Sequence, residues 1–308
     1  MNKQFTRREF LVTGSMAAAG LALFTGCNNG DNERRFLEGA KIGVIDINGR
    51  DGVQFGGLGR PAELAAVEKA ARIGFEGVEI TFGGPDEDGI LRLAREDRQQ
   101  QYFDEFEKHG IGPAGTHLMV LHENHLKNPD DLLAVQWVEQ AIPATASLGT
   151  EVILLPFFFE GAIEERHEQE YVADILRELA PEAEAHGVIL GLENTLSAED
   201  NMFILDRVQS PAVKVYYDVG NSNFFGHDIY EEIPFLGNNI CQFHIKDNPH
   251  YMGQGEIDFE RVFRLIDEIN FQGWMNIETL PVSGNIEDRE EDLRINLEYT
   301  RDTISRLS

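Results

Sequence analysis

Short apolar runs alternate with longer amphipathic stretches from about residue 40 to the end of the chain. In the longer stretches, such as residues 62–74 and 258–270, apolar positions recur every three or four residues, as they do along one face of a helix. This alternation favours parallel strands covered by helices. The expected strands are residues 41–47, 77–81, 112–118, 151–156, 188–194, 213–219, 239–246 and 273–278.

Glycine and proline mark the ends and interiors of the helical stretches. Several stretches end in a glycine just before the next strand, the position at which a left-handed residue caps a helix. Prolines fall inside two other stretches, where we expect a kink or break. The glycines are Gly74, Gly110, Gly149 and Gly187, and the prolines are Pro143 and Pro181.

Eight such units in about 270 residues fit a (β/α)8 TIM barrel, which typically has about 250 residues. A doubly wound open sheet is the alternative, but no G-x-G-x-x-G follows the first strand. No further shift in composition marks a second domain. We therefore predict an α/β protein with one barrel domain over residues 39–308, whose chemistry lies at the carboxyl ends of its strands.

Residues 1–26 have the features of an export signal. Lys3, Arg7 and Arg8 precede an apolar run that is shorter than the roughly 20 residues needed to cross a bilayer. The sequence TRREFL at residues 6–11 resembles the twin-arginine pattern, whose route carries folded proteins across the inner membrane. A buried apolar helix of the fold is the alternative, but it does not explain the paired arginines. We expect export by the twin-arginine route.

Cys27 is the expected lipidation site. Residues 24–27, FTGC, resemble a lipobox, although Phe24 stands in place of the usual Leu. Residues 27–38 are polar and rich in Gly, Asn and Asp, as a tether is. We expect a periplasmic or membrane-anchored lipoprotein that contacts the membrane only through this anchor.

Charge and cysteine content exclude several classes of protein. The chain has 54 Asp plus Glu and 26 Lys plus Arg, a net charge of −28. A general nucleic-acid binder and a polybasic membrane-surface protein both need a basic footprint, so neither is expected. Two cysteines exclude a disulfide framework, and 42% hydrophobic residues exclude disorder.

Four successive predicted strands end in side chains that can bind a metal. They are Glu193, Asp218, His244 and Glu278. Three carboxylates at one barrel mouth repel each other unless they share a cation. Oxygen-rich ligation with one His suits Mn²⁺, Mg²⁺ or Co²⁺, and Zn²⁺ somewhat less because zinc favours nitrogen and sulfur ligands. The alternative is four separate residues, each held by a Lys or Arg partner.

Alternation along the seventh strand predicts which way its side chains face. Successive side chains point to opposite sides of a strand. If His244 points into the barrel, Gln242 does so too, while Cys241 faces the helices. Cys241 is then an inert thiol in apolar packing.

The chain resembles the xylose-isomerase-like superfamily of sugar isomerases and epimerases, which includes hydroxypyruvate isomerase, inosose dehydratase-like enzymes and the ketose 3-epimerases. The resemblance covers residues 40–300 and is most specific at HIKD, residues 244–247, and GQGEIDF, residues 253–259. It implies one divalent cation, Mn²⁺ first among the candidates, and two catalytic glutamates on opposite faces of a bound sugar. On this chain the implied metal set is Glu193, Asp218, His244 and Glu278, and the implied catalytic pair is Glu193 and Glu278.

Two departures concern sugar recognition. Some ketose 3-epimerases carry a His three residues after the metal Asp and an Arg six residues after the metal His, where this chain has Asn221 and His250. Tagatose or psicose specificity is therefore not transferred. Each further candidate for substrate contact also has an ordinary structural interpretation. The candidates are Asn221, Lys246 and His250, Glu79 at the end of the second strand, His117 at the end of the third strand, and Glu199 in the loop after the fifth strand.

The resemblance implies enediolate chemistry. The cation acts as a Lewis acid on a carbonyl and its neighbouring hydroxyl, while one carboxylate removes the adjacent proton and a second group returns a proton. Return to the same carbon is epimerisation, and return to the next carbon is isomerisation. Loss of a group beta to the carbonyl would instead make the protein a lyase or hydratase for 3-keto-glycosides, which stays open as an alternative.

We expect a small, non-phosphorylated keto-sugar or related polyol as substrate. The chain is strongly anionic, and no cluster of Lys or Arg stands at the strand ends to hold a phosphate. An endonuclease-IV-like enzyme would need more histidines and a basic surface. A non-catalytic sugar-binding lipoprotein is a further alternative, against which Glu193 and Glu278 argue. Barrels of this group often associate, so homo-oligomers are expected.

Overall fold

The computed structural model describes residues 36–46, 64–130, 132–279, 282 and 289–308. Eight parallel strands form a closed barrel in sequential order, as predicted. The ring closes where β1 pairs with β8, with Lys41 opposite Trp274. The strands are β1 (Lys41–Ile45), β2 (Gly77–Thr81), β3 (Gly112–His117), β4 (Val152–Pro156), β5 (Ile189–Glu193), β6 (Val213–Asp218), β7 (Ile240–Ile245) and β8 (Trp274–Ile277).

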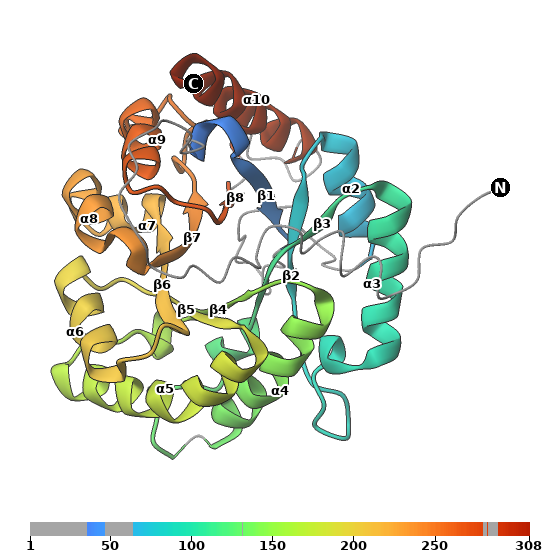
Figure 1. The fold of residues 1–308 in the computed structure, drawn as a ribbon, viewed down its shortest axis with the longest axis vertical. Coiled ribbons are helices and arrows are strands. Elements are labelled where there is room, and N and C mark those ends of the chain that lie inside the picture. The colour runs from blue at the N-terminus through green and yellow to red at the C-terminus, as the bar shows by residue number, and fades with distance from the viewer. Residues whose placement is uncertain (1–35, 47–63, 131, 280–281, 283–288) are drawn as a thin grey trace, which may run out of the picture. The chain divides into compact units, whose positions relative to one another are not determined.

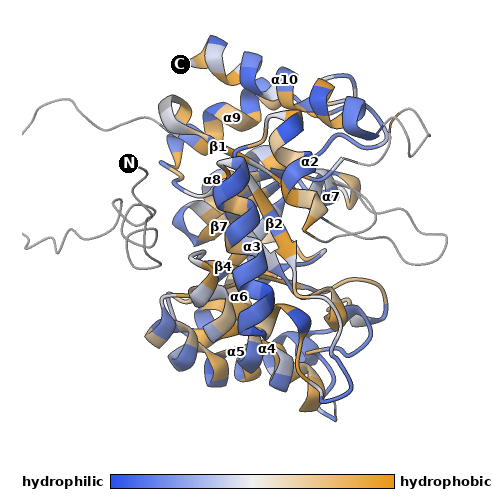
Figure 2. Ribbon diagram, turned by 90° about the vertical axis from the view of Figure 1, so that its right-hand side faces the viewer, coloured by the Kyte–Doolittle hydropathy of each residue, from blue (hydrophilic) through white to orange (hydrophobic). Residues whose placement is uncertain are grey.

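Helices surround the strands as a ring (Figure 1). Their outward faces are largely hydrophilic (Figure 2), because their apolar faces pack on the barrel wall. Within the described residues, no helix is both long and apolar enough to span a membrane. The helices are α2 (Ala65–Ile73), α3 (Glu96–His109), α4 (Leu132–Leu148), α5 (Arg166–His186), α6 (Ala198–Val208), α7 (Val219–Phe224), α8 (Ile229–Leu236), α9 (Phe259–Glu268) and α10 (Arg289–Leu307).

The predicted helix ends are confirmed, but the predicted proline breaks are wrong. All four glycines are left-handed, and Gly74, Gly110 and Gly187 each follow the last residue of a helix. In contrast, α4 and α5 continue through Pro143 and Pro181. Packing of their apolar faces against the barrel outweighs the hydrogen bond that each proline removes.

Most of the core lies between the barrel wall and the helices. Ile153, Leu155, Leu190 and Leu192 point outward into this layer and are fully buried. Burying one such side chain contributes about 1.5–3 kcal/mol. A smaller apolar cluster fills the inside of the barrel and consists of Val152, Leu154, Tyr216 and Cys241.

The predicted direction of Cys241 is wrong. Opposite β7, Val215 pairs with Ile240 but Tyr216 pairs with Gln242, so Cys241 is the extra residue of a bulge. Its thiol donates a hydrogen bond to the Val215 carbonyl inside the barrel. Burial raises the pKa of this thiol to about 12, so it stays protonated.

The barrel unit begins slightly earlier than predicted. A short 3-10 helix, η1 (Phe36–Gly39), precedes β1, and the side chain of Leu37 is buried in the core. The Leu37 amide also donates to Asp267 in α9. Residues 36–38, which we had assigned to the tether, therefore belong to the barrel. The export signal, Cys27 and the rest of the tether lie outside the described residues.

Candidate metal centre

Four strand ends bring one cluster of ionisable side chains together at the barrel mouth. Glu193 ends β5, Asp218 ends β6, His244 lies near the end of β7, and Glu278 directly follows β8. One ligand atom from each lies within 4.8 Å of all the others, and all four residues are buried. Three carboxylates and one imidazole form a donor set that fits a divalent cation. We call these four residues the tetrad.

Two positive side chains contact the tetrad carboxylates. The ammonium of Lys246 forms ion pairs with Asp218 and Glu278. His244 Nδ1 lies 2.9 Å from Glu193 Oε1 and 3.2 Å from Glu278 Oε2. Lys246, which we expected to contact substrate, is thus buried between two of the proposed metal ligands.

The two tetrad glutamates have pKa values shifted in opposite directions. Burial raises the pKa of Glu193 to about 7, and the charges of Glu278 and Asp218 act in the same direction. Burial also disfavours the charged form of Glu278, but Lys246 and His244 outweigh it and hold that pKa far below its usual range. A carboxyl group that can keep a proton near neutral pH therefore lies beside one that is ionised.

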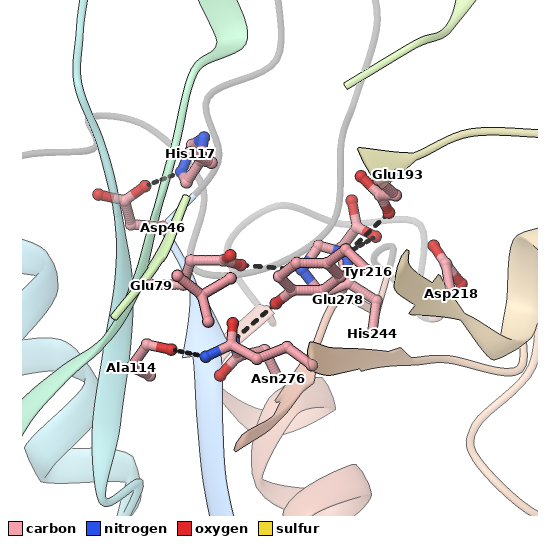
Figure 3. Close-up of polar contacts among 12 residues, drawn as sticks. Asp46, Glu79, Ala114, His117, Glu193, Tyr216, Asp218, His244, Asn276 and Glu278 are labelled. Carbon is pink, nitrogen blue, oxygen red and sulfur yellow. Dashed lines mark hydrogen bonds and ion pairs between the residues drawn. The ribbon is translucent and has the colours of Figure 1, made fainter. Parts of the chain in front are cut away.

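Glu79 supports His244 from the side opposite the tetrad. Its Oε2 lies 2.8 Å from His244 Nε2, and both residues are fully buried. The Tyr216 ring packs against the imidazole, with 4.6 Å between ring centroids, and the Asn276 amide donates to the Tyr216 hydroxyl (Figure 3). The expected exposure of Glu79 to substrate or water is not seen, because it points inward two residues before Thr81 ends β2. Carboxylates in this position fix the orientation of a metal-binding imidazole.

A second buried acid–imidazole pair lies at the ends of β1 and β3. His117 Nε2 is 2.8 Å from Asp46 Oδ1, and the Asp46 carboxylate also accepts from the Thr81 amide. Figure 3 shows this pair across Glu79 from the tetrad. Asp46 was not among the predicted site residues, although it directly follows β1 and is thus a strand-end carboxylate.

Three other candidate substrate contacts occupy different environments. The Asn221 amide donates to Asp218 Oδ1 at 2.9 Å in the first turn of α7, so its backbone anchors a tetrad residue. His250 is exposed, and its amide donates to the Asp247 carbonyl. Glu199 is exposed in the first turn of α6, and no hydrogen bond or ion pair between described residues joins it to the tetrad. The structure does not bring Glu199 into the site.

The motif after β7 has a structural explanation. The Asp247 carboxylate accepts from the amides of Gly253 and Gly255, which closes the loop. A Cβ on Gly255 would overlap that carboxylate, and Gly253 is left-handed. Asp258 then caps α9 by accepting from the Arg261 amide. The spacing of these residues thus shapes the loop behind Lys246.

Known proteins match the chain in sequence and fold. The family model described as xylose isomerase-like TIM barrel matches residues 67–303. The 2-epi-5-epi-valiolone 7-phosphate 2-epimerase of Actinoplanes sp. is 30% identical over 199 residues, 61% of this chain and 69% of that protein. The D-allulose 3-epimerase of Methylomonas sp. in complex with D-allulose superposes with a TM-score of 0.68 at 17% identity, over 86% of this chain and 97% of that one. The 3-keto-D-glucoside 4-epimerase of E. coli gives a TM-score of 0.63 at 17% identity, over 87% and 98%.

Proposed function

Because the chain belongs to the xylose isomerase-like TIM barrel family, we propose that it is a divalent-metal-dependent epimerase or isomerase of a small keto-sugar or related polyol. The observation that carries this proposal is the tetrad, in which three carboxylates and an imidazole share one buried space. The similarity to the 2-epi-5-epi-valiolone 7-phosphate 2-epimerase supports the reaction class.

The tetrad residues would hold the cation, for which Mn²⁺ is our first candidate. The donor set is mostly oxygen, and Lys246 and His244 offer two positive charges to three tetrad carboxylates and Glu79. A bound divalent ion supplies Lewis acidity, which polarises a carbonyl and stabilises negative charge on its oxygen.

Glu193 and Glu278 are the proposed proton-transfer residues. A carboxylate oxygen takes the proton from the carbon next to the carbonyl, and the electron pair of that C–H bond moves toward the carbonyl oxygen. The other carboxyl group returns a proton to the same carbon from the opposite face, which is epimerisation, or to the neighbouring carbon, which is isomerisation. In the metal-free protein burial raises the pKa of Glu193 to about 7, whereas a bound cation would favour the ionised form of both glutamates, as a proton-accepting carboxylate requires.

Proton exchange tests this proposal directly. Manganese-loaded protein should incorporate deuterium from D₂O into a keto-sugar next to its carbonyl, as read by NMR. Glu193→Gln and Glu278→Gln should each lower the rate about 10²–10⁴-fold, whereas Glu170→Gln, on an exposed face of α5, should leave it unchanged. Exchange that persists in Glu278→Gln, or after removal of the metal by a chelator, would refute the proposal.

The charge of the chain supports a substrate without phosphate. The net charge is −28, and the Lys246 ammonium is already paired with two carboxylates. The substrate named for the Actinoplanes relative is a 7-phosphate, so the screen should contain matched phosphorylated and free ketoses and cyclitols. Turnover of phosphorylated compounds alone would overturn this preference. The screen should also include 3-keto-glycosides, from which an elimination product would support the lyase alternative.

We also propose export by the twin-arginine route followed by lipidation at Cys27. Support comes from Arg7 and Arg8 before an apolar run and from the sequence FTGC. A reporter fused to residues 1–27 should reach the periplasm only in cells with that route. The full chain should incorporate radiolabelled palmitate, and the Cys27→Ser variant should not. Export by the general secretory route would refute this proposal.

A further inference from the structure

We propose that Asp46 and His117 form a second substrate-binding element, in which His117 Nδ1 accepts a hydrogen bond from a polyol hydroxyl remote from the metal-bound oxygens. This inference rests on the proposed function, because the ligand is the substrate itself. It adds Asp46 as the residue that positions His117, and it assigns the sugar hydroxyl as the donor and His117 Nδ1 as the acceptor of the hydrogen bond.

The barrel backbone holds the Asp46 carboxylate in place. The Thr81 amide lies 3.0 Å from Oδ1 and 3.1 Å from Oδ2, and the Asp46 amide donates to the Glu79 carbonyl of β2. His117 Nε2 is 2.8 Å from Oδ1, and both side chains are fully buried. Because a carboxylate only accepts, Nε2 carries the proton, and in the neutral ring Nδ1 is the acceptor.

His117 Nδ1 is a buried nitrogen without a hydrogen-bond partner among the residues that the structure describes. A buried polar atom without a hydrogen bond destabilises the fold, so such an atom calls for an explanation. The other buried histidine of the site, His244, has both ring nitrogens paired, to Glu79 and to Glu193.

The position of this pair suits a ligand that extends away from the tetrad. The tetrad comes from β5 to β8, whereas Asp46 and His117 come from the ends of β1 and β3, so the two groups divide the barrel mouth between them. In Figure 3, Glu79 lies between the pair and His244. A polyol bound to the cation through two neighbouring oxygens has further hydroxyls that point elsewhere, and His117 Nδ1 can accept from one of them.

The test compares variants with a series of monodeoxy sugars. For a keto-sugar that the manganese-loaded protein exchanges in D₂O, His117→Phe should lower kcat/KM about 10–100-fold. With the analogue that lacks the hydroxyl bound by His117, the kcat/KM of wild type should fall, and His117→Phe should have the same kcat/KM as wild type. With every other analogue, His117→Phe should show the same loss of kcat/KM relative to wild type as it does with the complete sugar. His186→Phe, an exposed histidine of α5, is the matched control.

Two further variants keep the test valid if His117→Phe folds poorly. His117→Gln retains one donor for Asp46 and one acceptor for the hydroxyl, so it should recover part of the lost activity. In Asp46→Asn the new amide can donate to Nε2, which leaves the proton on Nδ1 and makes it a donor. The kcat/KM of this variant should therefore be lower than that of wild type with the complete sugar, and equal to it with the same deoxy analogue.

The outcomes separate the inference from the proposed function. Equal losses with all analogues would mean a structural role and would overturn the inference alone. If wild type neither exchanges nor binds any sugar by calorimetry, the proposed function fails and the inference fails with it.

Discussion

At the scale of single residues, the site is a problem of charge. Glu193, Asp218, Glu278 and Glu79 surround one imidazole, and Lys246 neutralises two of them from within the tetrad. Several kcal/mol are needed to bury each ion, so every charge here depends on its neighbours. Lys246 and a divalent cation would therefore compete for the same carboxylates.

Replacing Lys246 should affect the metal-free and metal-loaded protein differently. In Lys246→Met, Asp218 and Glu278 lose their partner, so the metal-free protein should become about 3–5 kcal/mol less stable. Mn²⁺ should restore more stability to the variant than it adds to wild type, and should bind the variant more tightly. Urea unfolding with and without Mn²⁺ measures the first effect, and calorimetry the second. Lys127→Met, which removes an ion pair to Glu168 at the start of α5, is the control. An equal loss of stability in the metal-free and the metal-loaded variant would contradict competition between Lys246 and the cation.

Removing the charge of Glu79 should weaken metal binding, although Glu79 is not one of the proposed metal ligands. Glu79→Gln can no longer stabilise the orientation of His244 as a carboxylate does, so Mn²⁺ affinity should fall about 10–100-fold. Titration calorimetry measures this, with Glu87→Gln in the exposed loop after β2 as control. Unchanged affinity would show that Glu79 does not position the imidazole.

At the scale of elements, two local irregularities place residues that the regular pattern misplaces. The bulge at Cys241 turns that side chain inward next to Gln242. The loop after β7 is closed by Asp247, which binds two glycine amides. Both features adjoin His244 and Lys246, so the geometry of the site depends on them.

The loop after β7 should not tolerate a side chain at position 255. In Gly255→Ala, the new methyl group would overlap the Asp247 carboxylate and break the loop, at a cost of about 1–3 kcal/mol. Gly39→Ala, where a Cβ meets nothing within 4 Å, is the matched control and should change stability little. Urea unfolding distinguishes the two. Equal stability of both variants would show that the loop rearranges freely.

At the scale of the whole molecule, the barrel joins residues that are far apart in the chain into one titrating unit. His244 contacts Glu79 in β2 and Glu193 in β5, which are 165 and 51 residues away. Metal binding to this unit should stabilise the entire fold, by about 2.7 kcal/mol at a metal concentration 100 times the Kd.

The effect of pH should depend on Glu193. Its folded pKa of about 7 exceeds the ordinary value of 4.5, so between these pH values the folded state holds a proton that the unfolded state has lost. The metal-free protein should therefore lose up to about 3 kcal/mol of stability as pH rises through this window. Mn²⁺ affinity should rise over the same range, because ligation requires the ionised carboxylate. Glu193→Gln should remove this part of both slopes, as measured by unfolding and calorimetry. Identical slopes in variant and wild type would contradict this assignment.

The periodicity of the chain was sufficient for the fold class, the strands and the convergence of the tetrad. A strand is visible as a local pattern, and in a parallel barrel all strands have their carboxyl ends at the same rim. The pattern alone therefore predicts that Glu193 and Glu278 lie close together. The start of the barrel was misplaced by a few residues, because Leu37 becomes buried only through contact with distant elements.

The amino-acid sequence by itself thus determined the barrel and the candidate metal ligands. Tertiary structure decided that Lys246 lies among those ligands, that Glu79 supports the imidazole, that Cys241 faces inward, and that Asp46 meets His117. The reason is that strand periodicity is a property of neighbouring residues, whereas ion pairs, bulges and buried hydrogen bonds depend on the register and depth of strands that meet only after the ring has closed.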